Sequence, residues 1–294
     1  MAPDAEPWVP EVDSGRLTAT RFADIGHVTE TGSTNTDLMA LAGQGNSGPR
    51  VLVTDHQTRG RGRQDRGWHD EPGDSLLVSV LVSVGPAGIG CVPLATGLAV
   101  VDAVGALLES TAAAPPLAVG LKWPNDVLVP MLGERKLAGI LAETTMAGDA
   151  RSLAGTDPDG PIPVVIGVGL NLRWSRPPTG DLARVAVTLG ELLESLGRSE
   201  PEASLRDTVL VYYLSALDRQ LTALDRPGGP AVLLDRYRDR CLTLGRQVSF
   251  ATIEATVRGT AVDLGPGGEL LVETADGGVV TMTAGDVHHV TDPG

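Results

Sequence analysis

The sequence predicts an α+β protein of two domains, a large one built from strands and helices and a small one built from strands. Three observations support this prediction. A length of 294 residues and a hydrophobic content of 42% suit one large core and a smaller unit. Segments with the hydrophobic pattern of strands and of helices both occur within residues 21–241. From residue 242 the chain changes to short strand-like runs separated by Gly and Asp.

The elements of the large domain follow from hydrophobic periodicity, capping residues and Gly or Pro breaks. Residues 1–20 are acidic and Pro-rich, and we expect a flexible tail. Ser33, Thr34 or Asn35 can cap a short helix that ends near Gly43. Ser75 to Val84 alternates Leu or Val with Ser, which is typical of a half-buried strand. Other strands are expected at 24–31, 51–57, 117–124, 126–130, 136–146 and 164–172, and helices at 93–110, 187–196, 201–224 and from about 230 to 241.

Two segments complete this outline. Residues 147–163 are rich in Gly, Pro and Asp and predict a long connection. The small domain contains five strand-like runs, which predict a small β-barrel. These runs are 246–250, 255–264, 269–274, 279–284 and 286–290.

The composition argues against several classes of protein. A formal net charge of −14 disfavours general binding to nucleic acid or to an anionic membrane, since both need a basic surface. The first residues contain neither a basic segment nor an apolar one, and the longest apolar run is too short to span a membrane. Cys91 and Cys241 match no zinc or redox spacing. We therefore expect a soluble cytoplasmic protein.

The chain contains only two lysines, Lys122 and Lys136, beside 21 arginines, and both lysines lie in one short stretch. Lys carries a compact charge on a slender stem, whereas Arg is a broad planar fork. A tight pocket that holds one cation against a carboxylate and a phosphate could require Lys. The alternative is that two surface lysines remain by chance.

A loop of Gly and Arg, residues 59–68, is the second unusual feature. Four arginines within eight residues concentrate positive charge on a backbone that glycine allows to approach a ligand closely. Trp68 adds an apolar anchor that a purely solvated loop does not need. The loop indicates phosphate binding, with a solvated surface loop as the alternative. It is not a Walker loop, because no Gly-Lys-Ser/Thr follows.

Two further motifs combine polar side chains with glycine. In Lys122–Asp126, Pro124 turns the chain beside Asn125 and Asp126. If paired strands flank the interval to Lys136, both lysines can point toward one pocket, and Gly139 lets a ligand lie against the strand. Residues 167–171 (GVGLN) repeat this arrangement with Asn171 at the end of a strand, although glycine in a strand can also mark a bulge.

Together these motifs resemble those of the biotin protein ligases. The motifs are GSTNTD, HQTRGRGRQDRGW, KWPNDV, KLAGIL and GVGLN, in this order over residues 25 to 175. The resemblance implies a catalytic domain of the class II synthetase type, with a mixed, largely antiparallel central sheet flanked by helices, followed by an SH3-like barrel. It also implies a reaction in which biotin's carboxylate attacks the α-phosphate of ATP to give biotinyl-5′-AMP. A lysine of a biotin carboxyl carrier domain then takes up the biotinyl group.

The resemblance also assigns roles to individual residues. Ser33, Thr34 and Gln57 are the expected contacts of the biotin ureido group, and Lys136 is expected to bridge biotin's carboxylate and the α-phosphate. Expected catalytic residues are Lys136, Arg63 and Lys122. The full set of expected biotin contacts is Ser33, Thr34, Asn35, Gln57, Gly60, Arg61, Gly62, Arg63, Trp68, Lys136 and Gly139. The expected ATP contacts are Arg61, Arg63, Arg66, Lys122, Asn125, Asp126, Lys136 and Asn171.

The metal and the partners follow from the same resemblance. No cluster of carboxylates suggests a metal site built by the protein, so we expect Mg²⁺ to be held mainly by phosphates and water. The expected partner is the carrier domain of a biotin-dependent carboxylase, with neither nucleic acid nor membrane, and the expected state is a monomer or a weak homodimer. About twenty residues precede the motifs, which predicts the absence of the winged-helix domain of bifunctional members and of repressor function.

Two details depart from the family pattern. Arg59 stands where the family has a small residue, and the turn at Met131–Arg135 is longer. Two other functions remain open from the sequence. One is a lipoate or octanoate ligase of the same fold, which would need a long apolar slot. The other is a biotin-binding regulator without catalysis.

Overall fold

The computed structural model describes residues 6–7, 10, 14–64, 66–111, 118–144, 160–201, 204–251, 256–283 and 285–290. Its centre is an eight-stranded sheet in which β2 and β3 run parallel and the other neighbours run antiparallel. The order across the sheet is β1 (Glu6–Pro7), β2 (Ile25–Thr31), β3 (Arg50–Gln57), β4 (Ser75–Val84), β8 (Ile162–Asn171), β7 (Arg135–Thr144), β6 (Asp126–Val129) and β5 (Gly120–Lys122). The predicted mixed, largely antiparallel sheet is confirmed.

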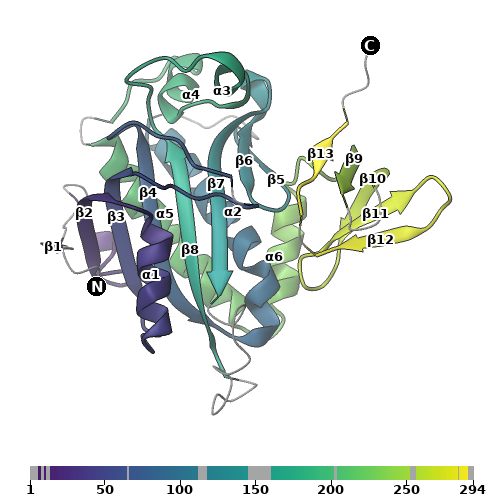
Figure 1. Ribbon diagram of the computed structural model, residues 1–294, viewed down its shortest axis with the longest axis horizontal. Helices are drawn as coiled ribbons and strands as arrows, with labels where there is room; N and C mark the ends of the chain where they lie inside the picture. Colours follow the sequence, from purple (N-terminus) through teal and green to yellow (C-terminus); the bar gives the residue numbers. More distant parts are fainter. Residues whose placement is uncertain are drawn as a thin grey trace.

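Helices cover both faces of this sheet (Figure 1). On one face α1 (Thr34–Gly43) packs Leu38 against Leu52 and Leu81, and on the other face the neighbouring residues of the same strands join the main core. This division follows from the strand period, because successive side chains point to opposite faces. The main core also contains α2 (Val92–Thr111), α5 (Leu205–Leu224) and α6 (Gly229–Arg238).

Shorter helices lie around these elements. They are α3 (Gly180–Val185), α4 (Leu189–Ser195) and the 3₁₀ turns η1 (Ser14–Arg16), η2 (Pro86–Cys91) and η3 (Pro130–Leu132). Among the described residues, one helical segment, Pro86–Ser110, has the length and apolar composition of a membrane span, and 78% of its apolar 18-residue window is buried within the molecule. Such burial is typical of the core helix of a globular protein.

Some expected elements differ from the observed ones. The strand at Ser75–Val84 was predicted to be half-buried, but helices lie over both faces of the sheet and nearly all of its side chains are buried. The strand expected at 117–124 forms only at Gly120–Lys122, because its last residues turn toward β6. α5 begins at Leu205 with Ser204 as its cap, and α3 was not predicted. The predicted connection at 147–163 lies mostly outside the described residues.

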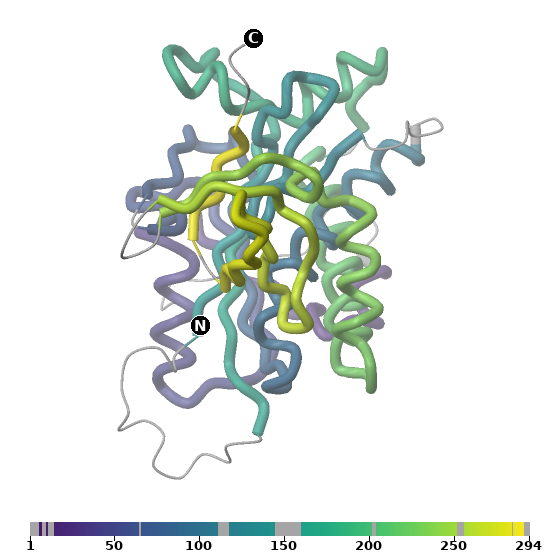
Figure 2. The backbone as a smooth tube through the Cα atoms, turned by 90° about the vertical axis from the view of Figure 1, so that its right-hand side faces the viewer, coloured from purple at the N-terminus to yellow at the C-terminus, as the bar shows by residue number. Residues whose placement is uncertain are grey.

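The C-terminal segment forms a second, antiparallel sheet, as the short strand-like runs predicted. Its order is β12 (Val279–Met282), β11 (Leu270–Thr274), β10 (Thr256–Leu264), β9 (Gln247–Ala251) and β13 (His288–His289). Figure 2 shows this sheet in yellow, facing the viewer. Closure into an SH3-like barrel stays a prediction.

Two contacts fix the small sheet against the large domain. The indole Nε1 of Trp123 donates to the carbonyl of Gly268 at 2.9 Å, and the amide of Leu242 donates to the carbonyl of Leu121 at 2.7 Å. At the other end of the chain, Glu6–Pro7 pairs with β2 and Leu17 is buried in the main core, so these parts of the predicted tail pack on the large domain.

Candidate active site

Three glycines on β7 and β8 form the floor of a cavity; Gly139, Gly167 and Gly169 are called the floor below. Gly139 lies opposite Gly169 in the antiparallel ladder. A Cβ on Gly169 would lie 2.6 Å from the ring of Trp68, and one on Gly167 would lie 2.2 Å from Oδ1 of Asn35. These positions carry no side chain of their own. The side chains of Trp68 and Asn35, which come from other elements, occupy the space above them.

The cavity above the floor has a volume of about 150 Å³. Residues from six elements and from the Gly/Arg loop line it. Thirteen of the residues predicted from the sequence are among them: Ser33, Thr34, Asn35, Gln57, Arg61, Gly62, Arg63, Arg66, Trp68, Asn125, Asp126, Lys136 and Gly139.

One end of the cavity is polar and is called the polar end below; it consists of Thr34, Asn35, Gln57 and Ser79. Oε1 of Gln57 accepts from the amide of Thr34 at 2.9 Å, and the hydroxyls of Thr34 and Ser79 are 2.7 Å from each other. Ser79 donates to Oδ1 of Asn35 at 2.6 Å. Since Thr34, Asn35 and Ser79 are all buried, these contacts hold the polar end in one arrangement.

The Gly/Arg loop folds over the cavity, and its described residues, 58–64 and 66–68, are called the lid below. The amide of Trp68 donates to the carbonyl of Gly60 at 3.0 Å, so the lid doubles back on itself. Gly60 permits this close approach, because a Cβ there would lie 2.6 Å from the carbonyl oxygen of Trp68. This folding of the lid places the ring of Trp68 against the floor.

Three arginines tie the lid to three other parts of the molecule. Arg61 pairs with Glu143 on β7, and Arg66 pairs with Asp286 of the C-terminal segment. Arg63 donates to Oδ1 of Asn125 at 3.2 Å. Burial lowers the pKa of Arg63 from its usual value, although a guanidinium with so high a pKa stays charged at neutral pH. The lid therefore brings three permanent positive charges to the rim of the cavity.

Lys136 is the cation on the floor side of the cavity. Its Nζ lies 2.7 Å from Oδ1 of Asp126 and 5.8 Å from the centre of the Trp68 ring. β7 carries both Lys136 and Gly139, and Nζ would lie 3.0 Å from a Cβ on Gly139. The ammonium is thus placed over the floor, beside the ring of Trp68.

Three predicted residues, Gly60, Lys122 and Asn171, lie outside the cavity lining. Both lysines were predicted to point into one pocket, but Lys122 does not line the cavity that Lys136 lines. β5 is an outer strand of the sheet, two strands from β7, and the ammonium of Lys122 acts on Asp286 and His289 instead.

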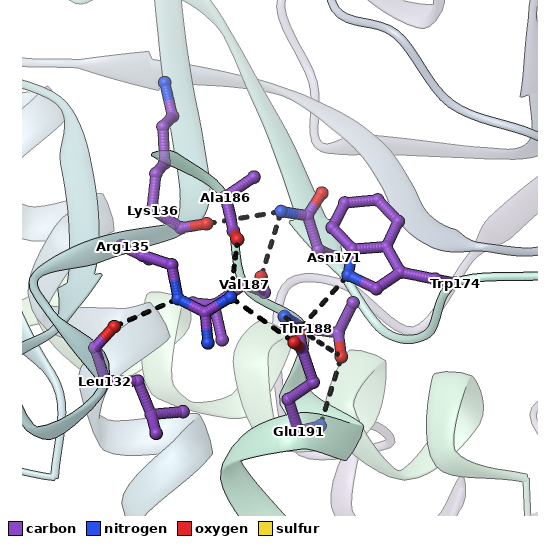
Figure 3. A network of polar contacts seen from close by, with 9 residues as sticks. All are labelled: Leu132, Arg135, Lys136, Asn171, Trp174, Ala186, Val187, Thr188 and Glu191. Atoms are coloured by element: carbon purple, nitrogen blue, oxygen red, sulfur yellow. Dashed lines mark hydrogen bonds and ion pairs between the residues drawn. The ribbon is translucent and has the colours of Figure 1, made fainter. Parts of the chain in front are cut away.

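Asn171 does not line the cavity, and its side chain faces the main chain of Lys136 and Val187 (Figure 3). Its Nδ2 donates to the carbonyls of Lys136 at 3.3 Å and of Val187 at 3.1 Å. The amide of Val187 also donates to the carbonyl of Lys136 at 3.0 Å. These contacts fix the main chain that carries the ammonium, so the structure gives Asn171 a positioning role.

The same figure shows how the segment before α4 is held. Glu191 accepts from Nε1 of Trp174 at 3.1 Å and from the amide of Thr188 at 2.8 Å, and it lies 3.4 Å from Arg135. Thr188 and Glu191 form a reciprocal cap at the start of α4. Arg135 directly precedes Lys136, so this network supports the same strand end.

Sequence reasoning missed three polar or charged side chains at the cavity, namely those of Ser79, Glu143 and Asp286. Ser79 and Asp286 line it, and Glu143 holds Arg61. The alternation of Ser in β4 was a signal for Ser79, because a hydroxyl at every second or fourth position of an apolar strand faces one side. No local pattern marks Glu143 or Asp286, whose roles depend on tertiary contacts.

Comparison with known proteins agrees with these motifs. Residues 27–154 match the Biotin/lipoate A/B protein ligase family, and residues 243–290 match the Biotin protein ligase C terminal domain. The chain is 37% identical over 268 residues to a biotin–acetyl-CoA-carboxylase ligase of Mycobacterium tuberculosis, and the match covers 90% of this chain and 88% of that protein. The chain belongs to the biotin protein ligase family.

Other family members are more distant. The bifunctional ligase/repressor BirA of Escherichia coli is 27% identical over 258 residues, covering 87% of this chain and 70% of that protein. Among solved structures, the biotin protein ligase of Aquifex aeolicus in complex with biotin and ATP matches with a TM-score of 0.67 and 24% identity, covering 90% of this chain and 99% of that one. This likeness confirms the biotin ligase fold.

Proposed function

We propose that this ligase attaches biotin to a lysine of a carboxylase carrier domain in two ATP-dependent steps. In the first step an oxygen of biotin's carboxylate bonds to the α-phosphorus of ATP, and the bond from that phosphorus to the bridging oxygen breaks, releasing pyrophosphate. In the second step the ε-amine of the acceptor lysine attacks the biotinyl carbonyl and AMP leaves. The activation is needed because a carboxylate and an ammonium do not condense in water.

One observation carries this proposal: Lys136 and the lid arginines surround a cavity that is polar at one end and flat along its floor. The transferring phosphoryl group spreads negative charge over its oxygens, and fixed cations stabilise that charge. The position of the Lys136 ammonium, between the floor and Asp126, supports a role for it where biotin's carboxylate meets the α-phosphate of ATP. Arg63 and Arg66, on the lid, support roles beside the phosphates.

The rest of the cavity suits the bicyclic part of biotin. Thr34, Gln57 and Ser33 offer hydroxyl and carboxamide groups to a ureido ring. Trp68, whose ring lies on the floor against Gly169, would pack against the bicycle. Gly60 and Gly62 would let the lid close, and Asn125 would guide the nucleotide.

A magnesium ion would neutralise the phosphate charge of ATP. The cavity contains the carboxylates of Asp126 and Asp286, but each is paired with a cation, Lys136 and Arg66 respectively. Among the residues that the structure describes, no group of three His, Cys, Asp or Glu side chains could hold a metal ion. This donor set fits a metal held mainly by phosphates and water, and Asp126 would be a carboxylate available to support it.

The acceptor is the biotin carrier domain of a carboxylase, as the name of the Mycobacterium relative implies. Two narrower statements remain proposals: a cytoplasmic protein that binds neither nucleic acid nor membrane, and a monomer or a weak homodimer. The formal charge of −14 supports the first of these.

A lipoate or octanoate ligase is the nearest alternative, since the matched family includes such enzymes. Lipoate and octanoate have only a hydrocarbon or dithiolane at the end remote from the carboxylate. Burying the polar end against such a group would leave its hydroxyl and carboxamide groups without partners, which costs about 1–3 kcal/mol for each. The polar end therefore favours biotin.

Pyrophosphate release tests the proposal. The chain is incubated with Mg²⁺-ATP and either biotin, lipoate or octanoate, and we expect release with biotin alone. Addition of a carrier domain should then increase the carrier's intact mass by one biotinyl group. Release with lipoate instead would support the alternative ligase, and binding of biotin without any release would support a regulator.

A further inference from the structure

A chain of hydrogen bonds runs from the lid to the polar end through Glu143. One carboxylate oxygen of Glu143 pairs with Arg61, and the other accepts from Nδ2 of Asn35 at 2.9 Å. Asn35 accepts from Ser79 at 2.6 Å, and Ser79 contacts the hydroxyl of Thr34 at 2.7 Å. Five side chains from the lid, β7, α1 and β4 are thus connected in series.

The direction of each bond in this chain is fixed by Glu143. A carboxylate can only accept, and the main-chain oxygen of Leu141, 3.2 Å from Nδ2 of Asn35, can also only accept. Both therefore require the NH₂ side of the Asn35 amide. Oδ1 of Asn35 must then face Ser79.

The hydroxyl protons follow from that orientation. Ser79 has one proton and donates it to Asn35, so its oxygen accepts the proton of Thr34. Thr34 then has no proton left for Oε1 of Gln57, although the two oxygens lie 3.1 Å apart and both residues line the cavity. Oε1 of Gln57 is itself an acceptor, held by the amide of Thr34 at 2.9 Å.

The hydroxyl oxygen of Thr34 and Oε1 of Gln57 are thus two acceptors without a proton between them. A ligand in the cavity can supply the missing hydrogen-bond donor. A ring N–H directed between them would satisfy both, whereas an oxygen at that position would repel both. Because the carboxylate of Glu143 and the main chain of Leu141 together orient Asn35, the acceptor character of the polar end depends in part on Glu143, which does not line the cavity.

We propose that Glu143 is a positioning residue that sets Thr34 and Gln57 as acceptors for one ureido N–H of biotin and holds the closed lid through Arg61. This inference rests on the proposed function. Since the two oxygens of one carboxylate serve the two tasks, lid closure and ureido recognition are coupled.

Two biotin analogues test the direction of the hydrogen bonds. In each, one ureido N–H is replaced by an ether oxygen, which gives a cyclic carbamate. Calorimetric titration of the wild-type chain should show that one of the two analogues binds about 10- to 100-fold more weakly than biotin, the loss expected for a buried acceptor pair without its donor.

Two variants then test the chain itself. In Ser79→Ala, the proton of Thr34 is released and can be donated to the analogue's oxygen, so the penalty should fall below about 5-fold. In Glu143→Gln, only the main-chain oxygen of Leu141 still holds the orientation of Asn35, and the penalty should fall by less than in Ser79→Ala. We expect Glu143→Gln to raise KM for biotin about 10-fold with kcat for adenylation within about 3-fold of wild type, and to increase tryptic cleavage of the lid.

Glu200→Gln is the matched control, because Glu200 pairs with Arg173 away from the cavity and should change none of these values. A wild-type chain that does not bind biotin would overturn the proposed function. A wild-type chain that adenylates biotin but tolerates both carbamates equally would overturn this inference alone. So would a carbamate penalty that is the same in wild type, Ser79→Ala and Glu143→Gln.

Discussion

The two walls of the cavity are built in different ways. The floor and the polar end consist of positions on β3, β4, β7, β8 and α1, and Asn35 and Ser79 there are 4% and 0% exposed. The lid is a loop that three arginines tie to other parts of the molecule, and Arg61 and Arg66 are 44% and 58% exposed. One wall is part of the core, and the other lies at the surface.

This difference predicts how each wall responds to change. Buried polar groups that are bonded to one another hold one geometry, because displacement breaks those bonds. Exposed ion pairs contribute about 0–1 kcal/mol each and can exchange for water or for phosphate. The floor should therefore decide whether biotin fits, and the lid should decide how long it stays and when the nucleotide is enclosed.

The largest effect is expected at Lys136, the cation on the floor side. Lys136→Ala should lower the rate of adenylation about 10²- to 10³-fold, the loss typical when one group that stabilises transition-state charge is removed. Biotin binding should stay measurable, since the polar end is intact. Single-turnover pyrophosphate release measures the rate, and Arg258→Ala on β10 controls for the loss of a positive charge. Near-normal turnover would contradict the assignment.

The next largest effect is expected when a methyl group is added to the floor. In Gly167→Ala the new Cβ would lie 2.2 Å from Oδ1 of Asn35, so the buried chain at the polar end must shift. We expect about 10- to 100-fold weaker biotin binding and a loss of about 1–3 kcal/mol in the free energy of unfolding. Calorimetric titration and denaturant unfolding measure the two quantities.

Gly105→Ala is the matched control for this change, because nothing lies within 4 Å of a Cβ at that position on α2. It should leave biotin binding unchanged and stabilise the helix slightly. Equal binding by Gly167→Ala and Gly105→Ala would mean that the floor is not as rigid as the comparison of the two walls requires.

The sequence predicted the floor better than it predicted the lid's contacts. Glycine at every second position of a strand leaves one face of that strand open, whatever the rest of the fold, so Gly139, Gly167 and Gly169 could be found from local pattern alone. The same holds for the polar motif at Ser33–Asn35, since a helix start attracts such residues.

Contacts between distant segments could not be predicted in this way. Asp286 meets Arg66 across 220 residues of chain, and Glu143 meets Arg61 across 82. Lys122 was predicted to point into the pocket because it lies 14 residues before Lys136 in the sequence. Such a separation in sequence does not determine how many strands lie between two residues in a sheet. Asn171 illustrates the same limit, because a carboxamide at a strand end can face a ligand or bond to main chain.

The third prediction concerns the C-terminal sheet, to which the lid is tied. Burial, followed by the charges of Lys122 and Arg246, lowers the pKa of His289 to about 4, and Glu134 opposes this shift. Between pH 4 and 6.5 the unfolded chain therefore binds more protons at this histidine than the folded chain. Stability should fall as the pH decreases through this range and should be fully present above pH 6.5.

His289→Gln should remove this part of the pH dependence, about 2 kcal/mol between pH 6.5 and 4. The Thr243 hydroxyl, 3.1 Å from Nε2 of His289, can still bond to a carboxamide. Denaturant unfolding at both pH values measures the change, with His69→Gln as a control on the exposed surface. An unchanged slope in His289→Gln would show that other groups set the pH dependence.

The smallest effect is expected when one tie of the lid is removed. Asp286→Asn weakens the ion pair with Arg66. An exposed ion pair stabilises by at most about 1 kcal/mol. Tryptic cleavage at the lid arginines should therefore become no more than about 5-fold faster in the chain without ligands. With biotin and ATP present the rates should be equal, because Arg66 would then contact phosphate. Asp263→Asn, which removes an ion pair with Arg238 that does not involve the lid, should leave both rates unchanged. A large increase in Asp286→Asn would mean that the lid is held mainly by the C-terminal segment, and the contrast between a fixed floor and a loosely tied lid would then be wrong.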